Sequence, residues 1–254
     1  MKQIPFAKFS LAVLFLCLFI SNGHAQAINS ADVDAFQVAD QAGTRDAYQG
    51  YLDAFPTGVF SVVARERARP ALLTDLLPRM TPDKPKRGKS ARSELDQVWQ
   101  EAWDRVKASD TEAGYLEYLS IRGPAYMVRP ALRDAMSRYY ELAEGNAASV
   151  PTGLACNVPN RDVKRLTNFS IERAYPDKAI AAGLQGTIDG FHIVASTGKV
   201  LGFLITHVTE PAFYVPVTNE AMNMSFSPAR RNCLNVASLP KLTVSFTTSF
   251  SSSR

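Results

Sequence analysis

The chain has 254 residues, of which 46% are apolar and 20% are charged. These values are typical of a globular protein with room for two small domains. The formal net charge is +4 at pH 7, and two of the lysines lie among the first eight residues. The remaining charge of about +2 is too small to predict a nucleic-acid-binding protein.

The N-terminal residues follow the order of a secretory signal peptide. Two lysines precede an apolar run at 11–20, and small residues up to Ala27 follow it. The run is shorter than a membrane span requires. We therefore expect residues 1–25 to be a cleaved signal peptide and the mature chain to be periplasmic. The alternative is an uncleaved segment, which would make the membrane a partner.

Residues 28–146 are predicted to form a helical repeat domain with copies at 32–77 and 94–145. Each copy contains a threonine that follows a break in the helical pattern and can cap the next helix. Positions 67 residues apart match in type: Phe36 and Trp103, Thr44 and Thr111, Tyr48 and Tyr115, Tyr51-Leu52 and Tyr118-Leu119, and Ala64 and Ala131.

An aromatic stripe is expected on one helical face of the first copy, because Tyr48, Tyr51, Leu52 and Phe55 are spaced by three and four. We expect the stripe to pack between helices, and a ligand groove is the alternative. The copy resembles short tetratricopeptide-like repeats of bacterial envelope proteins. That resemblance implies a surface for docking a peptide or protein.

Two linkers are predicted. The first, at 78–92, is basic and rich in proline, and the second lies at 147–159. Proline and like charges oppose packing in a core, so the first linker is expected to be solvated. Contact with anionic lipid or cell-wall polymer is the alternative. The serine-rich tail at 249–254 is expected to fray.

The last third of the chain is predicted to fold in the order short helix, β-hairpin, helix, strand. The hairpin turn is centred on Gly198, where a positive φ is tolerated. Alternating apolar residues predict that the last strand has one buried face. The expected elements are a helix at 178–184, strands at 186–195 and 200–207, a helix at 217–226 and a strand at 241–250.

These elements carry a resemblance to the TonB C-terminal domain family over residues 160–250. The resemblance depends on Tyr175-Pro176, Gly186-Thr187-Ile188, Gly198-Lys199-Val200, Phe226-Ser227-Pro228-Ala229 and the final strand. It implies a small α+β domain that binds an extended segment of a protein partner by strand addition, as in transport across the outer membrane. The partner-binding residues that it implies are Lys241, Leu242, Thr243, Val244, Ser245 and Phe246 on the strand edge, with Tyr175 and Pro176.

The chain also departs from that family. The Gln-Pro pair that usually precedes Tyr-Pro is absent, and no long proline-rich spacer is present. Arg231-Asn232-Cys233 stands where many members have Asn-Gly, which predicts a crosslinked loop in place of the turn. A membrane-anchored energy transducer is therefore an alternative only if the N-terminal segment stays uncleaved.

Cys156 and Cys233 are the two cysteines outside the signal segment. An even pair in an oxidising compartment predicts a disulfide. A Cys2His2 zinc site with His192 and His207 is the alternative, although the spacing matches no compact ligand pattern. We therefore expect no metal site.

No catalytic motif stands out, such as a Gly-x-Ser-x-Gly elbow, a His-Glu-x-x-His helix or a phosphate-binding glycine loop. We expect no enzyme activity and no cofactor. The expected function is binding of an envelope protein, for example an outer-membrane transporter, or of a second copy of the chain, through the strand at Lys241–Phe246. A helical-repeat scaffold with a structural C-terminal domain is the alternative.

Overall fold

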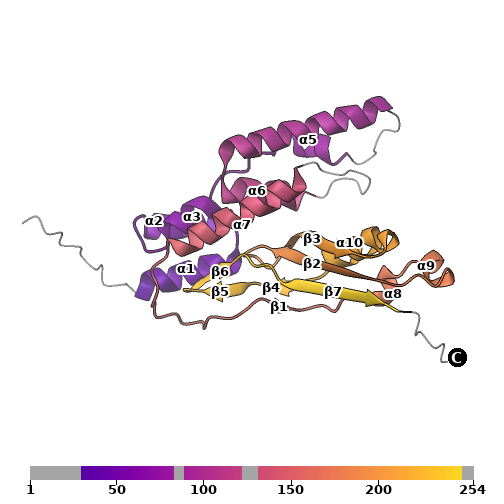
Figure 1. Ribbon diagram of the computed structural model, residues 1–254. Coiled ribbons are helices and arrows are strands. Elements are labelled where there is room, and N and C mark those ends of the chain that lie inside the picture. The colour runs from indigo at the N-terminus through magenta and orange to yellow at the C-terminus, as the bar shows by residue number, and fades with distance from the viewer. Residues whose placement is uncertain (1–29, 83–88, 122–130, 248–254) are drawn as a thin grey trace, which may run out of the picture.

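The computed structural model describes residues 30–82, 89–121 and 131–247 (Figure 1). It contains both helices and sheet, in agreement with the α+β expectation. The signal segment and the C-terminal tail lie outside the described residues. None of the described helices is long and apolar enough to cross a membrane.

The described residues up to Ala148 contain helices and no strands. The expected linker at 78–92 is shorter than predicted, because α4 includes Pro78 and α5 already begins at Lys89. Pro78 is tolerated there since the first turn of a helix needs no backbone donor. The helices are α1 Ser30–Ala42, α2 Arg45–Ala54, α3 Ser61–Arg67, α4 Leu77–Met80, α5 Lys89–Ser109, α6 Glu112–Ser120 and α7 Leu132–Ala148.

Threonine caps begin α2 and α6. The Thr44 side chain accepts a hydrogen bond from Ala47 N (3.3 Å), and the Thr111 side chain accepts one from Gly114 N (3.2 Å). The residue before each threonine has a positive φ, 62° for Gly43 and 45° for Asp110. The capping role predicted from the sequence is therefore confirmed at both positions.

The aromatic stripe packs between helices. The Phe36 ring lies 6.2 Å from the Tyr48 ring and 5.3 Å from the Tyr51 ring. The Trp103 ring has the corresponding contacts with Tyr115 (6.2 Å) and Tyr118 (5.9 Å). All four tyrosines are buried, so the interhelical packing expected for the stripe is confirmed.

The described residues after Ala148 contain short helices and three small antiparallel sheets. The largest sheet has the strand order β3-β2-β7, with β2 in the centre. The elements are β1 Lys164–Arg165, α8 Ile171–Ala174, α9 Asp177–Ala181, β2 Gly186–Val194, β3 Val200–Val208, the 3-10 helix η1 Pro211–Phe213, α10 Tyr214–Met222, β4 Phe226–Ser227, β5 Ala229–Arg231, β6 Leu234–Val236 and β7 Lys241–Phe246.

The predicted hairpin and last strand are confirmed with small changes of bounds. Gly198 has a φ of 83° in the β2–β3 turn, as expected. Helix α10 covers Tyr214–Met222, whereas the sequence predicted a helix at 217–226, and Phe226 lies in strand β4 instead. Pro216 fits because the first turn of a helix has no intrahelical donor to lose.

The crosslinked loop expected at Arg231-Asn232-Cys233 is instead a tight hairpin turn between β5 and β6. Asn232 and Cys233 have φ values of 49° and 68°, and Arg231 pairs directly with Leu234. Two positive φ values are typical of a type I′ turn, which favours Asn-Gly. The turn is therefore retained, with a disulfide-bonded cysteine at the usual glycine position.

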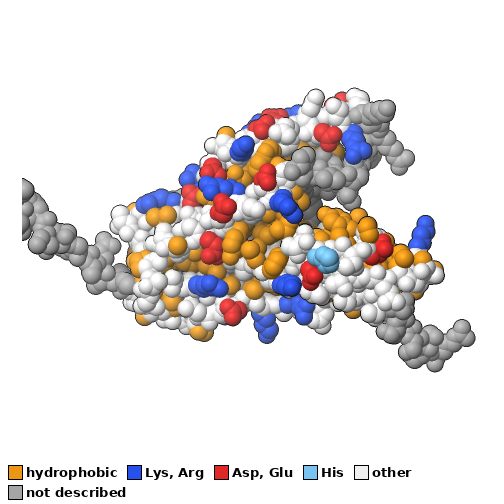
Figure 2. Space-filling view, in the orientation of Figure 1, with side chains coloured by type: hydrophobic (Ala, Val, Ile, Leu, Met, Phe, Trp, Pro, Cys, Tyr) orange, Lys and Arg blue, Asp and Glu red, His pale blue; other side chains and the backbone are white. Residues whose placement is uncertain are grey.

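The three-stranded sheet has a core on each face. Helices α8, α9 and α10 pack with residues such as Ile188, Val244 and Phe246 on one face. Ile193 and Leu201 near the β2–β3 turn belong to the core of α5, α6 and α7 on the other. The helical layer therefore lies across the turn end of the sheet (Figure 1). Figure 2 shows hydrophobic side chains along this junction, with charges of both signs around them.

Candidate functional site

The outer side of β7 is an open sheet edge. Within the described residues β7 pairs only with β2. The opposite edge strand, β3, is contacted by α6, α7 and α10. An uncovered edge presents unpaired backbone groups on which a further strand can form. The open edge therefore coincides with the strand that the sequence singled out.

The register shows which backbone groups of β7 face outward. Val194 and Ser238 exchange two backbone hydrogen bonds (3.0 and 2.9 Å), and His192 N donates to Pro240 O (3.0 Å). Hydrogen-bonded and non-hydrogen-bonded pairs alternate along an antiparallel ladder. In the continuous register, Leu242, Val244 and Phe246 lie opposite Gly190, Ile188 and Gly186. Their backbone groups face β2, so those of Lys241, Thr243 and Ser245 face the open edge.

The side chains of β7 also alternate. Leu242, Val244 and Phe246 are buried, and Lys241, Thr243 and Ser245 are exposed. The Thr243 hydroxyl donates to Asp189 Oδ1 on β2 (2.5 Å), and Lys241 Nζ lies 3.9 Å from the same oxygen. The residues whose backbone groups face outward therefore have polar side chains. Asp189 contacts two of these side chains, those of Thr243 and Lys241.

Tyr175 and Pro176 are less exposed than the outward-facing side chains of β7. The Tyr175 side chain is buried, and its hydroxyl donates to Leu184 O. Its ring lies 4.9 Å from that of Phe246 and 5.4 Å from that of Phe213. Pro176 is half-buried and precedes α9. Tyr175 therefore supports β7 from the core side and offers a partner no surface.

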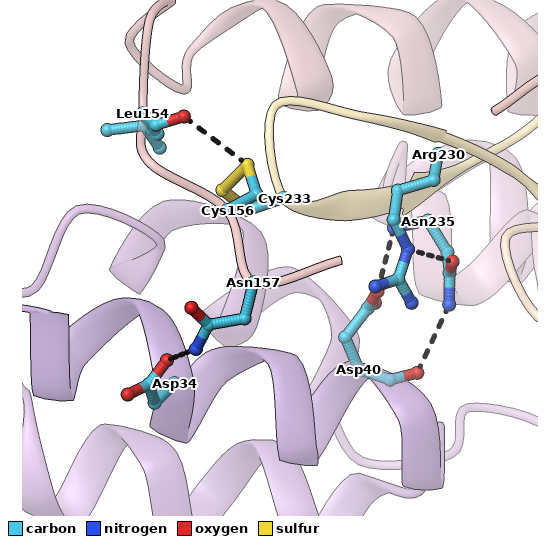
Figure 3. The surroundings of a disulfide bond; sticks show 8 residues. All are labelled: Asp34, Asp40, Leu154, Cys156, Asn157, Arg230, Cys233 and Asn235. Carbon is cyan, nitrogen blue, oxygen red and sulfur yellow. Dashed lines mark hydrogen bonds between the residues drawn. A yellow bond between two sulfur atoms is a disulfide. The ribbon is translucent and has the colours of Figure 1, made fainter. Parts of the chain in front are cut away.

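The expected disulfide between Cys156 and Cys233 is confirmed, with a Cα–Cα distance of 5.2 Å. Figure 3 shows that it ties the segment after α7 to the β5–β6 turn. Both sulfurs are bonded to each other, so they are not thiolate ligands for zinc. Among the described residues no group of three or more His, Cys, Asp or Glu side chains could hold a metal ion.

A buried charged network joins the helices to the β5–β6 hairpin. Arg67 on α3 donates to Asp40 Oδ1 on α1 and to Asn235 O on β6 (2.8 Å). Asp40 Oδ2 accepts from Asn235 N (2.7 Å), as Figure 3 shows. Arg67 Nε also lies 4.0 Å from Glu112 Oε1 on α6. This contact set spans 195 residues of sequence between Asp40 and Asn235.

The network changes the acidity of its members. Burial raises the pKa of Tyr48 to about 12, and Arg67 beside it opposes that change. Burial alone would lower the pKa of Arg67, but Tyr48, Glu112 and Asp40 together raise it. Arg67 is therefore a permanent cation held between two buried carboxylates.

This network could not be recognised from the sequence. The four residues are distant in sequence, and no motif connects them: Asp40, Arg67, Glu112 and Asn235. Only the packing of α1, α3 and α6 on the hairpin brings them together. No family model, curated protein or solved structure matches the chain.

Proposed function

We propose that the chain is a non-enzymatic periplasmic interaction module. Residues 160–250 form a domain similar to the TonB C-terminal domain, and β7 of that domain binds an extended segment of an envelope protein by strand addition. The supporting observation is the open edge of β7, where backbone groups of Lys241, Thr243 and Ser245 face outward. Main-chain hydrogen bonds to such an edge give affinity, and side-chain contacts on the two faces give specificity.

The two faces of β7 define the segment that fits. One face continues the apolar row of Leu242, Val244 and Phe246, and the other carries Lys241 and polar hydroxyls. A bound strand with alternating residues would extend both rows. The fitting segment is therefore alternating, with an acidic or polar residue opposite Lys241.

The test is crosslinking from the edge in intact envelope. A photoreactive residue at Ser245 is expected to crosslink one defined envelope protein, identified by mass spectrometry. Thr243→Pro removes an outward donor and is tolerated on an exposed edge, so it should abolish that crosslink. Thr243→Val keeps the backbone donor and should retain it. Equal crosslinking by the proline variant, in a chain that melts like the parent, would overturn strand addition.

A second copy of the chain could bind the β7 edge in the same way, by strand addition. Pairing of two β7 strands about Thr243 would place Lys241 opposite Ser245 of the other copy, without like charges in contact. Sedimentation of the full chain shows directly whether it is a monomer or a dimer. A dimer that Thr243→Pro converts to monomer identifies the partner as a second copy. A monomer that still gives the envelope crosslink identifies a different protein.

A helical scaffold is the second candidate function. The threonine caps and aromatic contacts recur at an interval of 67 residues, which supports the proposal that α1–α3 and α5–α7 are two repeat copies. Val38 and Val62 are 70% and 50% exposed on these helices. In this case Val38→Asp with Val62→Asp should abolish partner capture, whereas Thr243→Pro should leave it unchanged.

A further inference from the structure

Two arginines lie opposite each other beside the β5–β6 hairpin. The segment before β1 runs antiparallel to β5, and Arg161 pairs with Arg230. The two residues exchange backbone hydrogen bonds, from Arg161 N to Arg230 O (3.0 Å) and from Arg230 N to Arg161 O (2.8 Å). Directly opposite residues of an antiparallel pair project from the same face. Both side chains therefore lie on one face, where like charges repel.

Each guanidinium group is held in place through its Nε atom. Arg161 Nε donates to Pro228 O (3.1 Å). Arg230 Nε donates to Asn235 Oδ1 (3.3 Å), as Figure 3 shows. Four of the five N–H donors of an arginine belong to its terminal nitrogens. Within residues 30–82, 89–121 and 131–247 no ion pair or side-chain hydrogen bond engages the terminal nitrogens of either arginine.

The terminal nitrogens of both arginines reach the surface. Arg161 is exposed, and Arg230 is 6% exposed. Several unpartnered side-chain atoms are fully enclosed in the described part of the chain, and those of Arg230 are not among them. A group from outside the protein can therefore contact the terminal nitrogens of both residues.

Arg230 has no carboxylate of its own. Asp40 is the acidic group that influences it, but Asp40 Oδ1 accepts from Arg67 and Asp40 Oδ2 accepts from Asn235 N. Burial lowers the pKa of Arg230, Asp40 opposes that change, and Arg161 adds to it. A cation that is nearly buried and lacks a directly bonded anion is costly. The pair of arginines therefore lacks a counter-ion.

The surroundings of the pair are also basic. Lys164 and Arg165 on β1 are exposed, and Asp162 is the one acidic residue of the segment 160–166. Figure 2 shows basic side chains along the lower edge of the molecule, where β1 and β5 lie. Clustered charges of one sign raise the local concentration of the opposite ion. The counter-ion that fits is therefore an anion from solution.

We propose that Arg161 and Arg230 form a binding site for a phosphate group. Guanidinium groups bind phosphate oxygens in a bidentate manner. A phosphate monoester has three acceptor oxygens and a charge of about −1.5 to −2 at pH 7, which matches two adjacent guanidinium groups. A carboxylate has a single charge and fewer oxygens, so it would neutralise only one of them. The bound phosphate group also removes the repulsion between the two arginines.

The first experiment is calorimetric titration of the full chain at about pH 7.5, where a phosphate monoester is mainly dianionic, and at constant ionic strength. The probes are inorganic phosphate, glycerol 3-phosphate and acetate. Both phosphates are expected to bind with a Kd below about 10 mM, and acetate should bind at least about tenfold more weakly. Absence of binding by both phosphates overturns the proposal, and so does equal binding of acetate.

The second experiment distinguishes a lipid headgroup from a soluble phosphorylated compound. The full chain is sedimented with vesicles of phosphatidylcholine, with and without phosphatidic acid, whose headgroup is a phosphate monoester. Binding only to the vesicles with phosphatidic acid, with release by inorganic phosphate, identifies a headgroup. Binding of the soluble phosphates without vesicle binding identifies a soluble compound. Vesicle binding that inorganic phosphate does not release and that Arg161→Gln does not weaken would contradict the assignment to this pair.

Variants test the two arginines. Arg161→Gln keeps an exposed polar side chain and should weaken phosphate binding at least about tenfold. Arg161→Glu places a carboxylate opposite Arg230, so it should abolish phosphate binding and raise the melting temperature of the phosphate-free chain. Arg231→Gln removes a charge from the next residue of β5, which projects from the other face, and this matched control should bind like the parent. Unchanged phosphate binding by both Arg161 variants would contradict the assignment.

The phosphate site does not depend on the proposed strand addition. Arg230 lies in the β5–β6 sheet, whereas β7 belongs to a different sheet. Thr243→Pro should therefore bind phosphate like the parent, and Arg161→Gln should retain the envelope crosslink from Ser245. Loss of phosphate binding by Thr243→Pro, in a chain that melts like the parent, would contradict a site at the two arginines.

Discussion

Cys233 occupies the second central position of the β5–β6 turn with a φ of 68°, and its sulfur is bonded to that of Cys156, 77 residues earlier. A residue with a Cβ in this left-handed conformation costs about 1 kcal/mol relative to glycine. The disulfide therefore anchors a turn whose sequence is not the optimal one for its backbone. Since β6 also carries Asn235, the same crosslink fixes the strand that meets Asp40.

Replacement of both cysteines by alanine should lower the free energy of unfolding by about 4 kcal/mol, because the unfolded chain regains the freedom of a long loop. Cys156→Ala with Cys233→Gly should be about 1 kcal/mol more stable than the double alanine variant, since glycine adopts the required φ without strain. Urea denaturation of the two double variants measures the difference. If the glycine variant is no more stable, the turn conformation does not strain Cys233.

Acid should destabilise the fold through His192. This side chain is 1% exposed and lies between the rings of Phe203 (4.9 Å) and Phe226 (5.0 Å). Burial lowers its pKa from 6.5 to about 4, and Arg165 adds to that direction. The unfolded chain therefore binds a proton more readily than the folded chain, and stability should decrease between pH 6.5 and pH 4. The expected loss from this group is about 3 kcal/mol.

Urea denaturation at several pH values measures that slope. His192→Leu should flatten the profile between pH 6.5 and pH 4, although carboxylates elsewhere contribute at the acid end. His207→Asn, at an exposed position on β3, is the control for removal of a histidine. A parent profile that does not change in this interval would refute the assignment.

Much of the secondary structure was predictable because it depends on local signals. Thr44 and Thr111 begin helices where the sequence placed caps, and Gly198 has the positive φ expected of its turn. The last strand was recognisable from alternation, and its alternate residues are buried as expected. Capping, turn conformation and alternation are each determined by a few adjacent residues.

The tertiary features were not predictable in this way. The alternation of β7 is the same for an edge strand and for a central one, so only the strand order shows that it has an open side. The pairing of Asp40 with Arg67 and Asn235 depends on how three distant segments pack. Strands β5 and β6 have three residues each, too few to give a periodic signal.

Replacement of glycine by alanine should change the stability of the chain in opposite directions at two positions. Gly198 has a φ of 83°, and an added Cβ would lie 2.4 Å from the backbone oxygen of Phe226. Gly198→Ala should therefore cost at least about 2 kcal/mol. Gly145 lies exposed in α7 with no atom within 4 Å of an added Cβ. Gly145→Ala should stabilise the chain by about 1 kcal/mol through helix propensity. Thermal melting of both variants checks the contrast, and a stable Gly198→Ala chain would contradict the turn geometry.

Removal of Arg67 should be among the most destabilising single changes. Arg67→Met keeps most of the side-chain volume but leaves the carboxylate of Asp40, which is 1% exposed, without its directly bonded cation. Breaking such a buried pair from one side costs about 3–5 kcal/mol. Arg79→Met is the matched control, because its pair with Glu101 (3.4 Å) is largely exposed and should contribute at most about 1 kcal/mol.

A double-mutant cycle separates the ion pair from the packing of the arginine side chain. Asp40→Asn removes the carboxylate charge and leaves an amide that still contacts Asn235. In that background Arg67→Met should cost at least about 1 kcal/mol less than in the parent, because only the Glu112 carboxylate, and not also that of Asp40, then loses its cation. Equal costs in the two backgrounds would show that the Arg67–Asp40 pair does not contribute to the loss. Chemical denaturation of the four proteins at pH 7 gives the coupling, and low salt concentration is unnecessary because a buried pair is weakly screened.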